Sequence, residues 1–171
     1  MFGGMWRALV LLPVLLLQAC AGGAGHGGMS CAPFARALTG LDLHGDAADW
    51  WPQAAGRYAR LRQPVVGSVL VFARSARLPY GHVSVVSALR GPREITVIQA
   101  NWVPGVLETD RPVVDVSEAG DWSLVRVWWQ PARAMGVHPY AVDGFILPAT
   151  PQGHDALAEA APEAAQRAGG G

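Results

Sequence analysis

The sequence has 171 residues, which suffices for one domain with an ordinary core once the flexible-looking ends are set aside. Its 13 basic and 13 acidic residues balance at neutral pH, so the chain lacks the charge excess that nucleic acid or an anionic membrane surface attracts. Any partner must therefore be recognised by shape and local chemistry. No internal repeat is visible.

The amino terminus has the pattern of an export signal. Arg7 precedes an apolar run over residues 8–17 that is too short to cross a membrane and fits the core of a signal peptide. The Leu-Gln-Ala-Cys that ends at Cys20 resembles the lipobox of bacterial lipoproteins, which implies a signal peptide over residues 1–19 and a lipid on Cys20. The alternative is an ordinary secretory signal with Cys20 incidental. With no acidic residue after Cys20, the resemblance implies the periplasmic side of the outer membrane in a diderm host.

The two ends of the remaining chain differ from its middle in composition. Residues 20–30 are mostly glycine and alanine and predict a flexible tether. Residues 149–171 contain no large apolar residue after Leu157 and predict a disordered tail, despite a weak helical tendency. We therefore expect one folded domain over residues 31–148.

Within that domain, helical signals come first and strand signals follow. Ser30 suits an N-cap, Pro33 suits a first helical turn and Gly40 suits a helix end, so the sequence predicts a helix over 31–39. A second helix is expected over about 48–60. Alternating or continuous apolar runs predict four strands, at 67–72, 82–88, 94–102 and 122–129. Short links join antiparallel neighbours, so this order favours an α+β fold.

Cys31 is the first candidate for chemistry. The chain has two cysteines, and if Cys20 carries lipid, Cys31 is an unpaired thiol in an oxidising compartment. A helix start favours the thiolate through the helix dipole and unpaired N–H groups, which can also hold an oxyanion. We therefore predict that Cys31 is a nucleophile. The alternative is a small buried apolar residue.

A thiol nucleophile needs a base, and His82 is the best placed histidine. Two of the five histidines fall in the expected flexible ends, and His82 opens a predicted strand directly after Gly81, where a close approach is possible. The alternative is a surface histidine on an edge strand. On the next strand, Gln99 and Asn101 are expected on one face, where either amide could orient the imidazole and Trp102 could shield the contact from water.

The order of these motifs resembles the CHAP family, the cysteine and histidine dependent amidohydrolases and peptidases related to NlpC-type hydrolases. The resemblance is carried by CAPFARALTG, WWPQAAGRYA, GSVLVF, GHVSVV and ITVIQANW, which cover most of residues 31–129. It implies a papain-like fold with N-terminal helices packed on a small antiparallel sheet. It also implies Cys31 as nucleophile, His82 as general base and Asn101 as the residue that orients His82. Many members have an acidic residue where Gln99 stands, so either Gln99 substitutes for it or Asn101 suffices, and we favour Asn101.

The resemblance implies hydrolysis of amide bonds in the stem peptides of peptidoglycan through a thioester, by an endopeptidase or an N-acetylmuramoyl-L-alanine amidase. A silent lipoprotein scaffold that binds wall or a partner, and an acyl transferase, remain as alternatives. The sequence has no HExxH, no paired CxxC and no P-loop lysine, so neither a zinc site nor a nucleotide site is indicated. We expect no cofactor, no nucleic-acid partner and a monomer that contacts the membrane through its lipid.

Overall fold

The computed structural model describes residues 29–170. The α-helices in this range are α1 (Cys31–Thr39), α2 (Trp50–Gln53) and α3 (His154–Gly169), and single 3-10 turns lie at Ala47–Asp49 and Gln130–Ala132. The strands are β1 (Ala59–Leu61), β2 (Val69–Phe72), β3 (His82–Gly91), β4 (Glu94–Ala100), β5 (Leu107–Asp115), β6 (Leu124–Trp129), β7 (Ala134–Met135) and β8 (Tyr140–Leu147).

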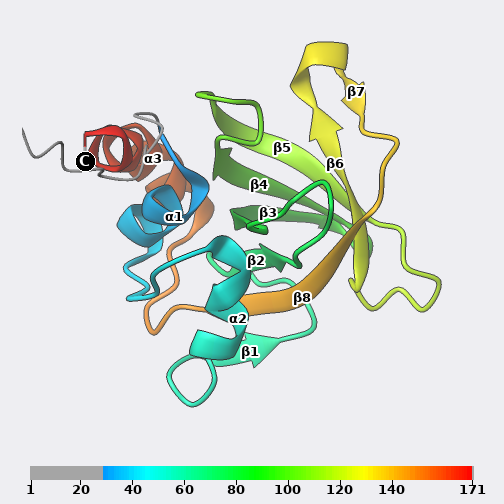
Figure 1. The fold of residues 1–171 in the computed structure, drawn as a ribbon, viewed down its shortest axis with the longest axis horizontal. Helices are drawn as coiled ribbons and strands as arrows, with labels where there is room; N and C mark the ends of the chain where they lie inside the picture. The colour runs from blue at the N-terminus through cyan, green and yellow to red at the C-terminus, as the bar shows by residue number, and fades with distance from the viewer. Residues whose placement is uncertain (1–28, 171) are drawn as a thin grey trace, which may run out of the picture.

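The strands form one antiparallel sheet that closes on itself. Its order is β1-β8-β2-β3-β4-β5-β6-β7, and β8 also pairs with β6, with Leu124 opposite Ala141 and Val125 opposite Tyr140. The six strands from β8 through β2, β3, β4 and β5 to β6 therefore make a barrel, and β1 and β7 are short extensions of it. Figure 1 shows the barrel beside α1 and α3.

The predicted fold class, a papain-like α+β fold with N-terminal helices packed on a small antiparallel sheet, is wrong. Strands dominate the described chain, and the sheet is a closed barrel because β5 and β8 complete it. Neither strand was expected from the sequence, because Asp110 and Pro112 interrupt β5 while Asp143 and Gly144 interrupt β8. Pairing with neighbouring strands outweighs these unfavourable local preferences.

The first predicted helix is confirmed as α1, and the second is largely wrong. Gly40 ends α1 with a left-handed φ of 71°, and its N–H donates to the carbonyl of Arg36. The segment predicted as helix over 48–60 contains only α2 and then turns at Gly56, whose φ is 73°. It finishes as β1, which pairs with β8.

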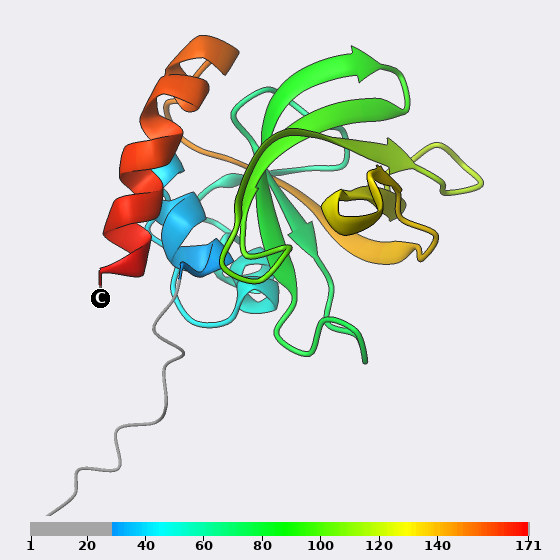
Figure 2. The same cartoon turned by 90° about the horizontal axis from the view of Figure 1, so that it is seen from above.

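The predicted disordered tail is also wrong where the chain forms α3. Leu157, Ala161 and Ala164 recur at helical spacing, are fully buried and pack in one cluster with Phe34 and Leu38 of α1. The weak helical tendency of this alanine-rich segment is thus stabilised by tertiary contact. Figure 2 shows α3 lying along α1 on one side of the barrel. No helix in the described range is both long and apolar enough to cross a membrane.

Strand β3 separates two cores. Val83 and Val85 pack in the cluster that α1 and α3 cover, which we call the helix face of the strand. Val86 packs in the second cluster, inside the barrel, and His82 and Ser84 alternate onto this same barrel face. Neighbouring β4 is divided in the same way, with Ile98 on the helix face and Val97 on the barrel face.

Candidate active site

Cys31 is the first residue of α1 and is half-buried against the start of β3. Burial raises the pKa of its thiol above the ordinary value, and hydrogen bonds from the backbone N–H groups of Val83 and Ala32 offset only part of this effect. The expectation that the helix start lowers the pKa of Cys31 is therefore wrong in its net direction. The thiol is the predominant form in the unliganded protein at neutral pH.

A groove of about 370 Å³ opens beside Cys31. It lies between the start of α1, the loop at residues 45–47 and the turn at Tyr80 and Gly81. Asp46 lines the groove, but Arg74 holds its carboxylate at 2.9 Å. The groove is the open approach from solvent to the Cys31 end of α1.

His82 is the first residue of β3 and is 4% exposed. Its ring lies between two aromatic rings, with centroids 5.5 Å from Phe72 and 5.0 Å from Trp102. Burial lowers the pKa of His82 to about 4, although the hydrogen bond with Gln99 acts in the opposite direction. The imidazole is therefore neutral at pH 7 and able to accept a proton, and the ring of Trp102 lies against it.

Gly81 permits the close approach that places His82. Its φ is 71°, and a Cβ there would lie 2.7 Å from the backbone nitrogen of Ala48 and 2.8 Å from the carbonyl oxygen of Phe72. Both are backbone atoms, which cannot move aside as a flexible side chain can. Any residue with a side chain at position 81 would therefore push the start of β3 away from the backbone of Ala48.

Gln99, and not Asn101, contacts the imidazole. The Nε2 of His82 lies 3.2 Å from the Oε1 of Gln99, which also accepts a hydrogen bond of 2.7 Å from the hydroxyl of Ser84. Asn101 is exposed, and its Oδ1 accepts a hydrogen bond from the N–H of Gly105. The preference for Asn101 as the orienting residue is therefore wrong. Strand β4 ends at Ala100, and the left-handed φ of 63° at Asn101 turns its side chain out of the alternation.

Two residues of this network were not singled out from the sequence. Ser84 shares the face of His82, so alternation along β3 was a signal for it. Glu108 accepts a hydrogen bond of 3.1 Å from the Nε2 of Gln99. Glu108 pairs with Gln99 across β4 and β5, and since β5 was not predicted, no sequence signal placed this carboxylate near the site.

Cys31 and His82 reach the start of β3 from its two sides. The thiol accepts the N–H of Val83 on the helix side, whereas the imidazole lies on the barrel face. Within residues 29–170, no hydrogen bond joins the thiol to the imidazole. A nucleophile and base pair at this place requires the thiol and the imidazole to approach each other when substrate binds, since catalytic hydrogen bonds often tighten only then.

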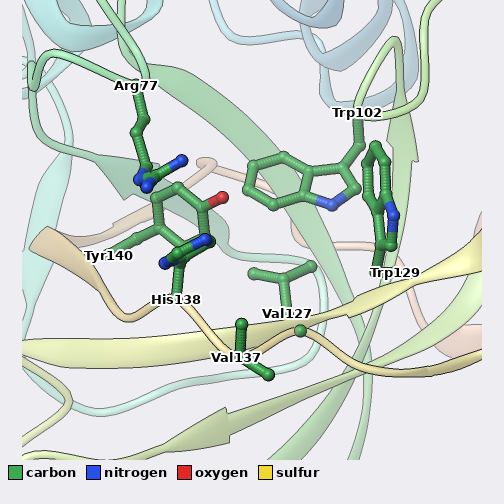
Figure 3. A pocket seen from close by; sticks show the side chains of 8 residues that line it. Arg77, Trp102, Val127, Trp129, Val137, His138 and Tyr140 are labelled. Atoms are coloured by element: carbon green, nitrogen blue, oxygen red, sulfur yellow. The ribbon is translucent and has the colours of Figure 1, made fainter. Parts of the chain in front are cut away.

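A second cavity, of about 360 Å³, lies on the other side of Trp102. Figure 3 shows Arg77, His138 and Tyr140 gathered on one side of this cavity, with Trp102 and Trp129 on the other. Trp102 thus contacts His82 and also lines a cavity open to solvent. Among the described residues, no group of three or more His, Cys, Asp or Glu side chains is arranged to hold a metal ion.

Comparison with known proteins confirms the resemblance noted in the sequence. The family model described as "CHAP domain" matches residues 21–101, a range that includes Cys31, His82, Gln99 and Asn101 and ends before Glu108. The comparison with curated proteins gives no match.

Among solved structures, the chain is similar to one described as "The crystal structure of Ly7917". The two chains share 16% identity with a TM-score of 0.44, and the alignment covers 72% of this chain and 54% of the other. This chain thus spans about half the length of that protein. Residues 21–101 are thus similar to the CHAP domain family.

Proposed function

We propose that this protein is a cysteine peptidase or amidase that hydrolyses amide bonds in the stem peptides of peptidoglycan. Cys31 is the nucleophile and His82 the general base. The proposal is supported chiefly by the convergence of a half-buried thiol at a helix start and a neutral, hydrogen-bonded imidazole on the same end of β3. The CHAP domain match gives this chemistry its substrate class.

The mechanism follows from the protonation states of the two groups. Since Gln99 presents Oε1 to His82, the imidazole donates from Nε2–H and keeps Nδ1 unprotonated. A thiol with a raised pKa does not ionise beforehand, so Nδ1 accepts its proton as the sulfur attacks the amide carbonyl. The C–N bond then breaks as the imidazolium protonates the leaving amine, which leaves a thioester on Cys31. Water, deprotonated by His82, hydrolyses the thioester and regenerates the thiol.

The oxyanion of each tetrahedral intermediate requires hydrogen-bond donors. Ser30 occupies the N-cap position of α1 without a side-chain cap bond, so its hydroxyl does not occupy the first N–H groups of the helix. Helix geometry directs these groups out of the N-terminal end of α1, where Cys31 and Ala32 line the groove. They are the donors that the proposed reaction uses.

The same proposal includes anchoring to the cell envelope through a lipid on Cys20. It rests on the lipobox-like sequence alone, because residues 1–28, and with them the signal peptide and most of the tether, lie outside the described residues. A tether of about ten residues reaches at most roughly 35 Å when extended, so an anchored enzyme would act only on wall near its membrane. Replacement of Cys20 by Ser should abolish incorporation of a labelled fatty acid and release the protein from the membrane fraction.

Digestion of purified peptidoglycan tests the activity. Protein beginning after Cys20 is incubated with wall beside Cys31→Ala, and released fragments are identified by mass spectrometry. We expect fragments only from the protein with the thiol. New peptide amine ends would identify an endopeptidase, and peptide-free sugar would identify an amidase. Equal release by Cys31→Ala, or wall binding without release across several wall types, would contradict the proposal, and the latter would favour the scaffold.

A further inference from the structure

The mechanism leaves one buried ionisable group next to the site without a role. Glu108 is 1% exposed, and its Oε2 accepts a hydrogen bond of 3.1 Å from the amide nitrogen of Gln99. Its Oε1 lies 3.9 Å from the Nε of Arg111. A carboxyl group is rarely buried without a specific partner, because removing its charge from water is costly.

A bulge in β5 brings Glu108 to this position. The pairing of β4 with β5 shifts between Val97, opposite Arg111, and Gln99, opposite Glu108. The extra residue lies in β5, where Asp110 has a left-handed φ of 52°. The shift places both Glu108 and Arg111 opposite barrel-face residues of β4, and bulges of this kind commonly redirect side chains near active sites.

The orientation of the Gln99 amide depends on Glu108. A hydroxyl and an imidazole can each donate or accept, so Ser84 and His82 would accommodate either end of the amide. An ionised carboxylate only accepts, so the amide nitrogen must point toward Glu108. The amide oxygen then faces His82 and Ser84, as observed at 3.2 and 2.7 Å. An oxygen in that position requires the proton of His82 to be on Nε2.

We propose that Glu108 is a positioning residue that sets the tautomer of His82 through Gln99, with Arg111 favouring its ionised form. The geometry that supports this is the buried hydrogen-bonded series His82, Gln99 and Glu108, with the partly exposed Arg111 3.9 Å from Glu108. Its catalytic consequence rests on the proposed function, since Nδ1 is then free to accept the proton of Cys31. The effect on the tautomer does not depend on that function.

The protonation of Glu108 should matter for the series. Burial raises the pKa of this carboxyl, while the hydrogen bond from Gln99 and the charge of Arg111 act against that rise. Once protonated, Glu108 can donate to Gln99, and the amide is no longer held in one orientation. The Nε2–H tautomer should therefore give way to a mixture of tautomers as the pH falls through the pKa of Glu108.

Glu108→Gln tests the proposal with almost no change in shape. A glutamine at this position can accept from or donate to Gln99, so both amide orientations become possible. We expect nitrogen NMR of the His82 ring to change from one tautomer, with the proton on Nε2, to a mixture. The rate of wall digestion per folded molecule should fall roughly 10- to 100-fold, as for other residues that orient a catalytic group. Thr96→Val is the control, because it removes a buried hydroxyl that links β3 and β4 outside this series.

A charge exchange separates this role from a purely structural one. In the double variant Gln99→Glu with Glu108→Gln, the carboxylate accepts directly from His82, Ser84 and the new amide, so the Nε2–H tautomer and most of the rate should return. Gln99→Glu alone places two carboxyl groups side by side. This single variant should show neither the Nε2–H tautomer alone nor the rate of the unmodified protein.

The two readouts distinguish the failure of this inference from the failure of the proposed function. If no wall is digested by any version but Glu108→Gln mixes the tautomers, the positioning role stands and the hydrolase proposal fails. If the unmodified protein digests wall and Glu108→Gln changes neither rate nor tautomer, the inference is overturned. A ring protonated on Nδ1 in the unmodified protein would overturn it as well.

Discussion

The two faces of β3 differ in the side chains they carry and in the contacts these make. On the helix face, Val83 and Val85 are fully buried in an apolar cluster with residues of α1 and α3. On the barrel face, His82 and Ser84 belong to a hydrogen-bonded polar series that crosses β4 to β5. Strand alternation allows one short segment to serve both packings, because neighbouring residues point in opposite directions. The helix face thus contributes mainly apolar packing, and the barrel face carries the polar groups to which we assign the chemistry. Cys31 lies at the end of the strand where the two faces meet.

Gly81 lies where the two faces meet, so a side chain there should damage both. Gly81→Ala adds the strain of a left-handed φ and an overlap with two backbone atoms. We expect it to lower the free energy of unfolding by about 4 kcal/mol and to reduce the rate of the molecules that remain folded. Urea unfolding and wall digestion measure the two effects. Gly91→Ala, at the other end of β3 with no atom within 4 Å, is the control, and an equal loss there would contradict the explanation.

Leu157 tests the helix face alone. This residue of α3 is fully buried in the apolar cluster that α3 forms with α1 and the sheet. Leu157→Ala should therefore lower the free energy of unfolding by about 3 to 4 kcal/mol. Because the His82 series lies on the other face, digestion per folded molecule should change less than about twofold, or roughly 0.4 kcal/mol. Urea unfolding checks the first value, with exposed Glu159→Ala as the neutral control. A large loss of rate at unchanged stability would mean that the faces are not separable.

The pH dependence of stability tests the barrel face. The unfolded chain protonates His82 near pH 6.5, but the folded protein protonates it only near pH 4. Between these values the unfolded state binds more protons, so the contribution of His82 is complete above pH 6.5 and falls by about 3 kcal/mol as the pH drops toward 4. The difference in unfolding free energy between the unmodified protein and His82→Gln should show this fall. A flat difference would mean that the imidazole is not buried in its neutral form.

The pH dependence of stability expected from His154 is opposite in sign to that expected from His82. It lies at the start of α3, where hydrogen bonding to Asp155 and the charge of Asp110 raise its pKa. Its contribution to stability is complete below its unfolded pKa and is lost as the pH rises through the folded one. His154→Gln should therefore change the pH profile in the opposite direction to His82→Gln.

The digestion rates of variants at Gln99 and Asn101 test which of these two residues orients His82. Gln99→Leu removes the acceptor from His82, and we expect digestion per folded molecule to fall about 100-fold, or about 2.7 kcal/mol. Asn101→Gly keeps the left-handed backbone and loses only a turn hydrogen bond, so its rate should fall less than about fivefold. A larger loss of rate in Asn101→Gly than in Gln99→Leu would indicate that Asn101 orients His82.

Much of the site could be predicted from local sequence, and much of the fold could not. The helix start at Cys31 has its own punctuation in Ser30, Pro33 and Gly40, and its bounds are confirmed. The β-branched run after His82 also predicts its strand directly, and alternation brings His82 and Gln99 to one face. Local sequence pattern was thus sufficient for α1, for the start of β3 and for the shared face of His82 and Gln99.

The errors have long-range causes. Strand β8 contains Asp143 and Gly144 and exists because three other strands pair with it. Gly144 is needed because a Cβ there would lie 2.5 Å from the ring of Trp51, a contact that no local rule can foresee. Asn101 was assigned to the site by extending the alternation one residue beyond the strand, and Glu108 was missed because its facing depends on a bulge. The closed barrel, the helical tail and the buried acid all depend on partners distant in sequence.

The pairing of β8 has a consequence for the order of events during folding. Tyr140–Leu147 contacts β1, β2 and β6, so the barrel remains open until more than three quarters of the chain is available. Before that point Phe72 and Trp102 lack Tyr140, which completes the aromatic enclosure next to His82. Such distant pairings form slowly. A nascent or truncated chain ending before β8 would hold the cysteine and the histidine without the enclosure that keeps the imidazole neutral, so the arrangement that we propose for hydrolysis would be complete only in the last stage of assembly.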